Sequence, residues 1–123
     1  MARTIAIVED DADIRRLLDL KLRAAGYETA FARDGVMALS VIRKARPDLI
    51  LLDLGLPGGD GFVILDRLRE FDALATIPVV VISARVQAET QERVELSGVA
   101  AFIEKPFDFG ELLQTVESIL AVR

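Results

Sequence analysis

Residues 4–11 read TIAIVEDD, an apolar run that stops at three adjacent carboxylates. Isoleucine and valine favour β-strands, and a nearly continuous apolar run is typical of a strand that is covered on both faces. Four more short apolar runs follow, so that the five occupy residues 4–8, 27–31, 49–52, 78–82 and 99–103. The sequence therefore predicts five strands, and the continuous runs indicate a sheet with helices on both sides.

Longer segments between these runs carry apolar residues at helical spacing. Four stripes are present: Ile14, Leu17, Leu18 and Leu22; Val36, Leu39 and Ile42; Phe62, Leu65 and Leu68; and Leu112, Leu113, Val116, Ile119 and Leu120. A further segment, residues 86–96, is mostly polar, and we expect a helix there with little buried face. Strands that alternate with helices predict an α/β fold with a parallel sheet and right-handed crossovers.

Several residues mark where the expected helices begin and end. Gly26 follows the first stripe and Pro47 follows the second, as is typical of the residues just past a helix. Three aspartates stand where N-caps are expected: Asp34, Asp60 and Asp108.

The composition limits the function classes that the chain can belong to. Its 123 residues suffice for one ordinary domain, and we expect a single domain over residues 1–123, with no output domain after the last stripe. The net charge of 15 − 20 = −5 argues against nucleic-acid binding. The chain has no cysteine and no histidine, which excludes disulfides, thiolate chemistry and an imidazole base. No apolar run approaches the roughly 20 residues of a membrane span, and we expect a cytoplasmic protein.

Polar and charged residues that could bind a ligand or react stand at the ends of the predicted strands. The first strand ends at Glu9 and Asp10, the third at Asp53, the fourth at Ser83 and the fifth at Lys105. In an open parallel sheet, sites form beyond the carboxyl ends of the strands. If the first and third strands are neighbours, their carboxylates converge into a hard-oxygen site, and Mg²⁺ is the cation that such ligands suit.

The same residues could serve phosphoryl chemistry. A carboxylate can act as a nucleophile and become an aspartyl phosphate. A lysine and Mg²⁺ would neutralise the charge on the phosphoryl oxygens, and a serine hydroxyl could donate a hydrogen bond to one of them. Asp53, Asp10, Ser83 and Lys105 make up such a set.

Four motifs in this order resemble the response-regulator receiver domain of two-component signalling: IAIVEDD, LLDLGLP, VVVISA and EKPF. The resemblance covers essentially the whole chain. It implies a flavodoxin-like three-layer (βα)5 fold with five parallel strands in the order 2-1-3-4-5. It makes Asp53 the phosphoacceptor, Asp10 a direct Mg²⁺ ligand, Glu9 a ligand through water, and the backbone carbonyl of Gly55 a further ligand.

The resemblance also implies how the domain switches and with what it interacts. Ser83 takes the position of the switch hydroxyl, Phe102 that of the switch aromatic, and Lys105 that of the lysine that contacts the phosphate. The Lys105–Pro106 bond is cis in family members. The phosphoryl donor would be a histidine kinase or a histidine phosphotransfer protein. A downstream protein would bind the face formed by segment 86–96, the last strand and the last helix.

Simpler structural roles stay open for several of these residues. Asp11 and Asp13 fit an N-cap and a first-turn acid, which the helix dipole favours. Ser83 on its own is an ordinary residue after a strand, and Lys105 on its own is an ordinary solvated lysine. Phe102 at a strand end could serve core packing alone.

The sequence departs from the common pattern of the family at two positions. Gly55 lacks the side chain that many members place beside the phosphoryl group, which leaves the phosphate lifetime open. Phe102 replaces the common tyrosine, so this side chain has no hydroxyl that could form a rotamer-dependent hydrogen bond. Four of the eight glycines fall within residues 55–61, and this favours a mobile loop beside the site.

Three other functions compete with that of a single-domain receiver. The chain could be the receiver of a larger response regulator such as a transcription factor, although Thr115 stands where the commonest DNA-binding branch has an arginine. A Mg²⁺-dependent phosphatase with Asp53 as nucleophile usually needs an acid two residues later, where this chain has Gly55. A nucleotide- or flavin-binding module needs a glycine-rich loop after the first strand, where this chain has acids.

Overall fold

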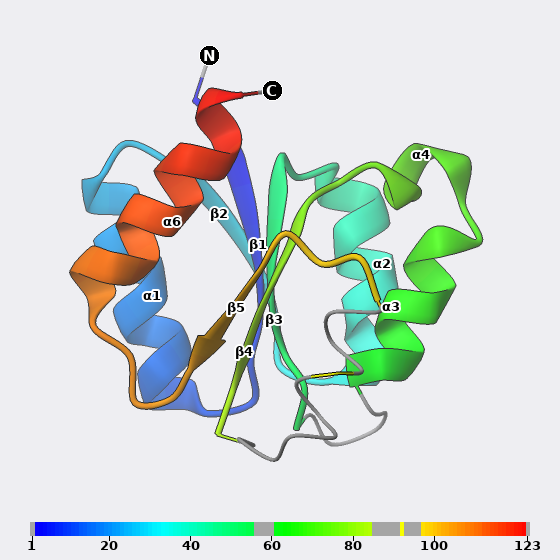
Figure 1. Ribbon diagram of the computed structural model, residues 1–123, viewed down its shortest axis with the longest axis horizontal. Coiled ribbons are helices and arrows are strands. Elements are labelled where there is room, and N and C mark those ends of the chain that lie inside the picture. The colour runs from blue at the N-terminus through cyan, green and yellow to red at the C-terminus, as the bar shows by residue number, and fades with distance from the viewer. Residues whose placement is uncertain (1, 56–60, 85–91, 93–96, 123) are drawn as a thin grey trace.

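The computed structural model describes residues 2–55, 61–84, 92 and 97–122, and it forms three layers with a sheet in the middle (Figure 1). Five parallel strands lie in the order β2-β1-β3-β4-β5. Their bounds are Thr4–Val8 for β1, Glu28–Ala32 for β2, Leu49–Asp53 for β3, Val79–Ser83 for β4 and Ala101–Glu104 for β5. The predicted α/β fold and the strand order implied by the resemblance are confirmed.

Helices cover both faces of the sheet. Their bounds are Ala12–Ala24 for α1, Gly35–Ala45 for α2, Gly61–Arg69 for α3, Asp72–Ala75 for α4 and Phe109–Ala121 for α6. Figure 1 shows α1 and α6 on one face, and α2, α3 and α4 on the other. The helix predicted over residues 86–96 lies outside the described residues, except for Glu92, and stays a prediction.

The buried side chains form one cluster on each face of the sheet. On the α1 and α6 side, Ile5 and Ile7 of β1 pack with Leu18, Leu22 and Leu112. The side chains between them along β1, at Ala6 and Val8, point to the α2 and α3 side. Every residue of β3 and β4 is buried, which explains why these runs are apolar without alternation.

Two residues of the predicted stripes do not face the core. Val36 has 76% of its surface exposed and Leu17 has 46%. Ala38 and Ile42 are the buried residues of α2. Val36 precedes Ala38 by two positions, which is about 200° around the helix at 3.6 residues a turn, so the helix turns it towards solvent. The expectation that it belongs to the core was wrong.

Caps are present at the ends of α1, α2 and α6. Asp34 accepts a hydrogen bond from the Met37 N–H, and Asp108 accepts one from the Glu111 N–H. Both predicted N-caps are confirmed, while Asp60 lies outside the described residues. Helix α1 ends in a Schellman motif around Gly26, whose φ of 98° suits a glycine.

The short helix α4 was not expected from the sequence. It has four residues, which is too few to show an apolar period, and its buried residue is Leu74. It fills the connection between α3 and β4. Among the described residues, no helix is both long and apolar enough to cross a membrane, and the cytoplasmic location stays a prediction.

Candidate functional site

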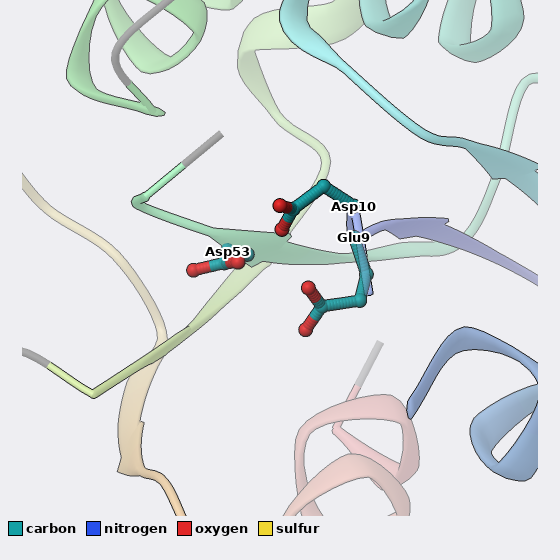
Figure 2. A group of neighbouring side chains, drawn as sticks. All are labelled: Glu9, Asp10 and Asp53. Carbon is teal, nitrogen blue, oxygen red and sulfur yellow. The ribbon is translucent and has the colours of Figure 1, made fainter. Parts of the chain in front are cut away.

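The carboxyl ends of β1 and β3 bring three acids together. Val8 pairs with Leu52 in the sheet, so the residues that follow them, Glu9 and Asp53, end up side by side. Figure 2 shows the carboxylates of Glu9, Asp10 and Asp53 gathered at these strand ends. Each offers an oxygen atom, and these atoms all lie within 4.8 Å of one another. The predicted convergence of Asp10 and Asp53 is therefore present, and Glu9 joins them.

Glu9 is the most buried acid of the site, with 0% of its surface exposed. Its backbone is fixed on two sides, because its N–H donates to the Ala32 carbonyl at 3.0 Å and its carbonyl accepts from Arg15 Nη1 at 3.0 Å. One carboxylate oxygen, Oε2, accepts a hydrogen bond from the Asp11 N–H at 3.2 Å. The resemblance implied that Glu9 binds Mg²⁺ through water, which stays a prediction, and the complete burial of Glu9 was not predicted.

Lys105 lies between two of the acids. Its Nζ is 2.6 Å from Glu9 Oε1 and 3.3 Å from Asp53 Oδ2, and it donates a hydrogen bond to the latter. Its backbone N–H donates to the Ser83 carbonyl at 2.9 Å, which holds the end of β5 against β4. The Lys105–Pro106 bond is cis, as the resemblance implied. Lys105 is therefore a partly buried counter-charge, with 16% of its side-chain surface exposed, and not a fully solvated lysine.

Glu9 and Lys105 both have shifted pKa values. Burial raises the pKa of the Glu9 carboxyl to about 7, since lost hydration outweighs the effects of the Lys105 ammonium and the Asp11 N–H. Burial alone would lower the pKa of Lys105, but Glu9 and then Asp53 raise it above its ordinary value. The lysine is thus a permanent cation at neutral pH, while Glu9 is poised between its two forms.

Asp53 ends β3 with 5% of its surface exposed. Its Oδ1 accepts a hydrogen bond from the Gly55 N–H at 3.0 Å, and its Oδ2 accepts the one from Lys105. A Cβ at position 55 would lie 3.7 Å from Asp53 Oδ1. A side chain there would therefore stand directly beside the carboxylate, and glycine leaves that space open. The metal-ligand role of the Gly55 carbonyl stays a prediction.

Gly61 is a residue of the site region that the sequence reasoning missed. A Cβ at this position would come within 2.7 Å of the Leu54 Cα and 3.0 Å of the Asp53 carbonyl oxygen. Its N–H donates to the Leu54 carbonyl at 3.1 Å. Only a glycine lets the start of α3 approach the end of β3 this closely. A glycine directly before the stripe that starts at Phe62 was the available signal.

Ser83 ends its strand as predicted, whereas Phe102 is the second residue of β5 and not at the carboxyl end of the strand. Ser83 is the last residue of β4, with 1% of its surface exposed. Phe102 is half-buried on β5 and packs against the core cluster on the α2 and α3 side. Their switch roles stay predictions, and the core-packing role of Phe102 is present in the structure. Asp11 is the N-cap of α1, with bonds from the Asp13 and Ile14 N–H groups, and Asp13 is the acid of the first turn.

The donor set fits a hard divalent cation such as Mg²⁺. Every group in the cluster is a carboxylate oxygen, which is the ligand chemistry that Mg²⁺ prefers. Glu9 Oε1 is buried and accepts no hydrogen bond from the described residues, although the Lys105 ammonium is at ion-pair distance. Asp10 is exposed, so a hydrated ion can reach the cluster from solvent. Three carboxylates and one ammonium also leave the cluster with negative charge in excess.

Comparisons with known proteins agree with this geometry. A family model described as the response regulator receiver domain matches residues 5–117. The polar-differentiation response regulator DivK of Brucella anthropi is 36% identical over 120 residues, which are 98% of each chain. The DNA-binding dual master transcriptional regulator RpaA of Synechocystis is 38% identical over 116 residues, which are 94% of this chain and 48% of RpaA.

A solved structure supports the same assignment. The chemotaxis response regulator CheY4 of Vibrio cholerae superimposes with a TM-score of 0.89 at 28% identity, over 97% of this chain and 99% of that one. The fold, the strand-end residues and these matches point the same way. The chain belongs to the response-regulator receiver domain family, which acts in two-component signalling.

Proposed function

We propose that this receiver accepts a phosphoryl group on Asp53, with Mg²⁺ bound by Asp10, Asp53, the Gly55 carbonyl and, through water, Glu9. The observation that carries the proposal is the placement of Lys105 Nζ, 2.6 Å from Glu9 and 3.3 Å from Asp53, beside three carboxylates that converge. Such a cluster combines a nucleophilic carboxylate with an ammonium group that can offset the negative charge of the phosphoryl group. The domain would therefore act in signalling, and the phosphoryl transfers would be limited to its own acceptor.

The transfer forms one bond and breaks another. A carboxylate oxygen of Asp53 attacks the phosphorus of a phosphohistidine, the P–N bond breaks, and the imidazole of the donor leaves and takes up a proton. Residues 1–123 contain no histidine, so the phosphohistidine would lie outside them, in a histidine kinase or a histidine phosphotransfer protein. When bound, Mg²⁺ would offset the negative charge of the phosphoryl oxygens.

The residues of the chain each contribute to this step. Lys105 donates a hydrogen bond to Asp53, and its ammonium would form an ion pair with the phosphoryl oxygens once the group is bound there. The Gly55 N–H fixes the carboxylate from the other side. The burial of Asp53 removes competing water, which strengthens both interactions. Fixed donors of this kind stabilise charge in the transition state without reorganising.

Phosphorylation would then shift the fourth and fifth strand ends. The phosphoryl group brings nearly two negative charges and three strong acceptors, to which Ser83 and Lys105 are drawn. A change from 1:99 to 99:1 takes about 5.5 kcal/mol. A charge pair near 4 Å is worth about 4 kcal/mol at an effective dielectric of 20, and a charged hydrogen bond adds about 1.5–3 kcal/mol. These contributions have the size that a switch through Ser83 and Phe102 needs.

The partner face in this proposal consists of segment 86–96, β5 and α6, next to the switch residues. A downstream protein would bind it in the phosphorylated state. DivK, which matches over 98% of its own length, supports a receiver that acts as a single domain over residues 1–123. RpaA, whose name includes DNA binding and which matches over 48% of its length, supports the alternative of a receiver within a larger regulator. In either case we expect the receiver to act in the cytoplasm.

Intact mass spectrometry after incubation with acetyl phosphate and Mg²⁺ tests the proposal. The wild-type chain should gain one phosphoryl group, and Asp53→Ala and a sample in EDTA should gain none. A gain that persists in Asp53→Ala would contradict the assignment of the acceptor. If acetyl phosphate gives no gain, a phosphorylated histidine phosphotransfer protein replaces it as donor. No gain from either donor, together with no Mg²⁺ binding by calorimetry, would contradict the phosphoryl mechanism.

A further inference from the structure

A basic and aromatic groove lies at the amino end of the sheet, opposite the acid cluster. It has a volume of about 490 Å³ and is lined by Arg43, Arg46, Pro47, Phe71, Ala73, Leu74 and Ile77. Helix α2 ends at one side of it and α4 forms the other. Figure 1 shows these two elements meeting at the end of the molecule that carries both chain termini. We call it the arginine groove.

The cations of the arginine groove are exposed and available. The Arg43 guanidinium lies over the Phe71 ring, 5.0 Å from its centre, and Phe71 has 38% of its surface exposed. Within the part of the chain that the structure describes, no carboxylate lies within ion-pair distance of Arg43, Lys44 or Arg46. The exposed guanidinium and ammonium groups of these three residues can therefore bind an anionic partner without first breaking an ion pair of the described residues.

A contribution to the stability of α2 explains the positions of Arg43 and Lys44 but not that of Arg46. Arg43 and Lys44 lie in the last turn of α2, where the helix dipole favours positive charge. Arg46 lies beyond the helix with a φ of 46°, and it is the one non-glycine residue with positive φ among those described. Glycine adopts this conformation without steric cost and is common there. An arginine at this position costs stability relative to glycine, which makes its side chain a candidate for a role beyond the fold.

The shape of the basic region indicates an extended ligand. A second hollow, lined by Leu39, Ser40, Arg43, Lys44 and Arg46, adjoins the arginine groove along α2. The two hollows share Arg43 and Arg46, so the cations form a strip. The floor of the groove is apolar, with Pro47 and Leu74 buried beneath it. A strip of cations beside an apolar floor complements a chain segment that carries acidic residues next to an apolar anchor.

We propose that the arginine groove binds an acidic peptide segment of a partner protein, with an aromatic or aliphatic side chain of that segment placed against Phe71 and Leu74. The acid cluster lies at the carboxyl ends of β1 and β3, whereas the residues of the groove lie at the end of α2 and just before β4, at the amino end of the sheet. Binding here therefore leaves Asp53 accessible. The interaction is present whether or not the domain is phosphorylated, and it would tether the receiver to a partner.

Selection from a displayed library of random dodecapeptides tests the proposal. The wild-type protein is the bait, and the charge-reversed variant Arg43→Glu/Arg46→Glu is the counter-bait. We expect enrichment of peptides that combine several Asp or Glu residues with an aromatic or aliphatic residue. An enriched peptide, labelled with fluorescein, should bind the wild type at least tenfold more tightly than the charge-reversed variant. No motif that distinguishes the two baits would overturn the proposal.

Two further variants separate binding from folding. Arg46→Gly removes the charge and relieves the positive φ, so it should raise the melting temperature and still weaken peptide binding severalfold. Arg16→Glu/Arg23→Glu makes the same charge change on the exposed side of α1 and should bind the peptide as the wild type does. Equal weakening by this control would show a general charge effect and would overturn the proposal.

Other occupants give different results. If sedimentation shows a dimer that Arg43→Glu/Arg46→Glu dissociates, the groove holds a second copy of this chain and the proposal is wrong. If a labelled single-stranded oligonucleotide competes with the peptide and binds more tightly to the wild type, the groove serves nucleic acid and the proposal is also wrong. Peptide binding at equal affinity with and without acetyl phosphate and Mg²⁺ is the result that we expect.

Discussion

The two ends of the sheet carry opposite charge in opposite surroundings. At the carboxyl end, Glu9 and Asp53 are buried around the lysine Lys105. At the amino end, Arg43 and Arg46 are exposed beside Phe71. Buried charges depend on one another because water cannot replace a lost partner, whereas exposed charges are hydrated anyway. Loss of a buried charge at the carboxyl end should therefore change stability and chemistry together, whereas loss of an exposed charge at the amino end should change binding with little effect of the lost charge on stability.

Lys105→Met should have the largest effect. It leaves Glu9 and Asp53 buried without their cation, and breaking a buried pair costs about 3 kcal/mol. Urea unfolding in EDTA at pH 8 measures this loss. The same variant should accept phosphate from acetyl phosphate about 10²-fold more slowly, the usual cost of one lost charge-stabilising donor.

Arg43→Met is the matched control at the amino end. Its guanidinium is exposed and has no ion pair among the described residues, so the change in the free energy of unfolding should stay within about 0.5 kcal/mol. Equal losses of stability for the two variants would break the comparison.

Gly61→Ala should come next. Its new methyl group would lie 2.7 Å from the Leu54 Cα, and overpacking of this kind costs about 2 kcal/mol. Thermal unfolding measures the loss. The matched control is Gly55→Ala, whose methyl would lie 3.7 Å from Asp53 Oδ1, an ordinary contact. That variant should keep its stability, and any change should appear in the phosphate lifetime, since the added group stands beside the acceptor.

The pH dependence of stability should reveal Glu9. Its pKa is about 7 in the folded protein and 4.5 as an unperturbed group, so the folded state binds more protons between these values. Stability of the metal-free protein should therefore be greatest below about pH 4.5 for this group and fall as the pH rises through about 7, by about 3 kcal/mol in all. The chain has no histidine, which keeps this window clear of imidazole titration.

Glu9→Gln checks the assignment of that pH dependence. Its amide does not titrate, so unfolding in EDTA between pH 5 and 8 should be nearly independent of pH. Mg²⁺ should flatten the curve of the wild type as well, because a bound cation favours the ionised carboxylate. An unchanged slope in Glu9→Gln would assign the titration to another group.

Arg46→Gly should have the smallest effect, and it should be stabilising. Relief of the positive φ favours the folded state, while the added freedom of glycine in the unfolded state partly offsets it, for a net gain of about 0.5 kcal/mol. Urea unfolding at neutral pH measures it. A loss of stability would mean that the Arg46 side chain stabilises the fold. The positive φ of Arg46 would then no longer support a role of this residue in peptide binding.

The features that follow from local chemistry could be predicted from the sequence. Continuous apolar runs identified β3 and β4, and Asp34 and Asp108 were recognised as caps, because each depends on a few adjacent residues. The meeting of Asp10 and Asp53 followed from parallel strands whose carboxyl ends share one edge. Here the resemblance added what residues alone leave open, namely the strand order and the cis bond before Pro106.

Features that depend on distances between segments could not be predicted. Gly61 is required because α3 begins in close contact with the end of β3. The spacing of apolar residues along the chain does not indicate this contact. Helix α4 is too short for a pattern. Burial of Glu9 against Lys105 joins residues 96 positions apart (105 − 9), and the arginine groove is assembled from α2, α4 and the connection to β4. Each requires the packing of the whole chain.

The central claim is that Asp53 is the nucleophile of the acid cluster. Its most direct test is to phosphorylate the protein in Mg²⁺, reduce it with borohydride and locate the product by peptide mass spectrometry, since borohydride converts an aspartyl phosphate to homoserine. Homoserine is expected at position 53, and none in a sample prepared with EDTA. Reduction at Asp10 instead, with Asp53 unmodified, would contradict it.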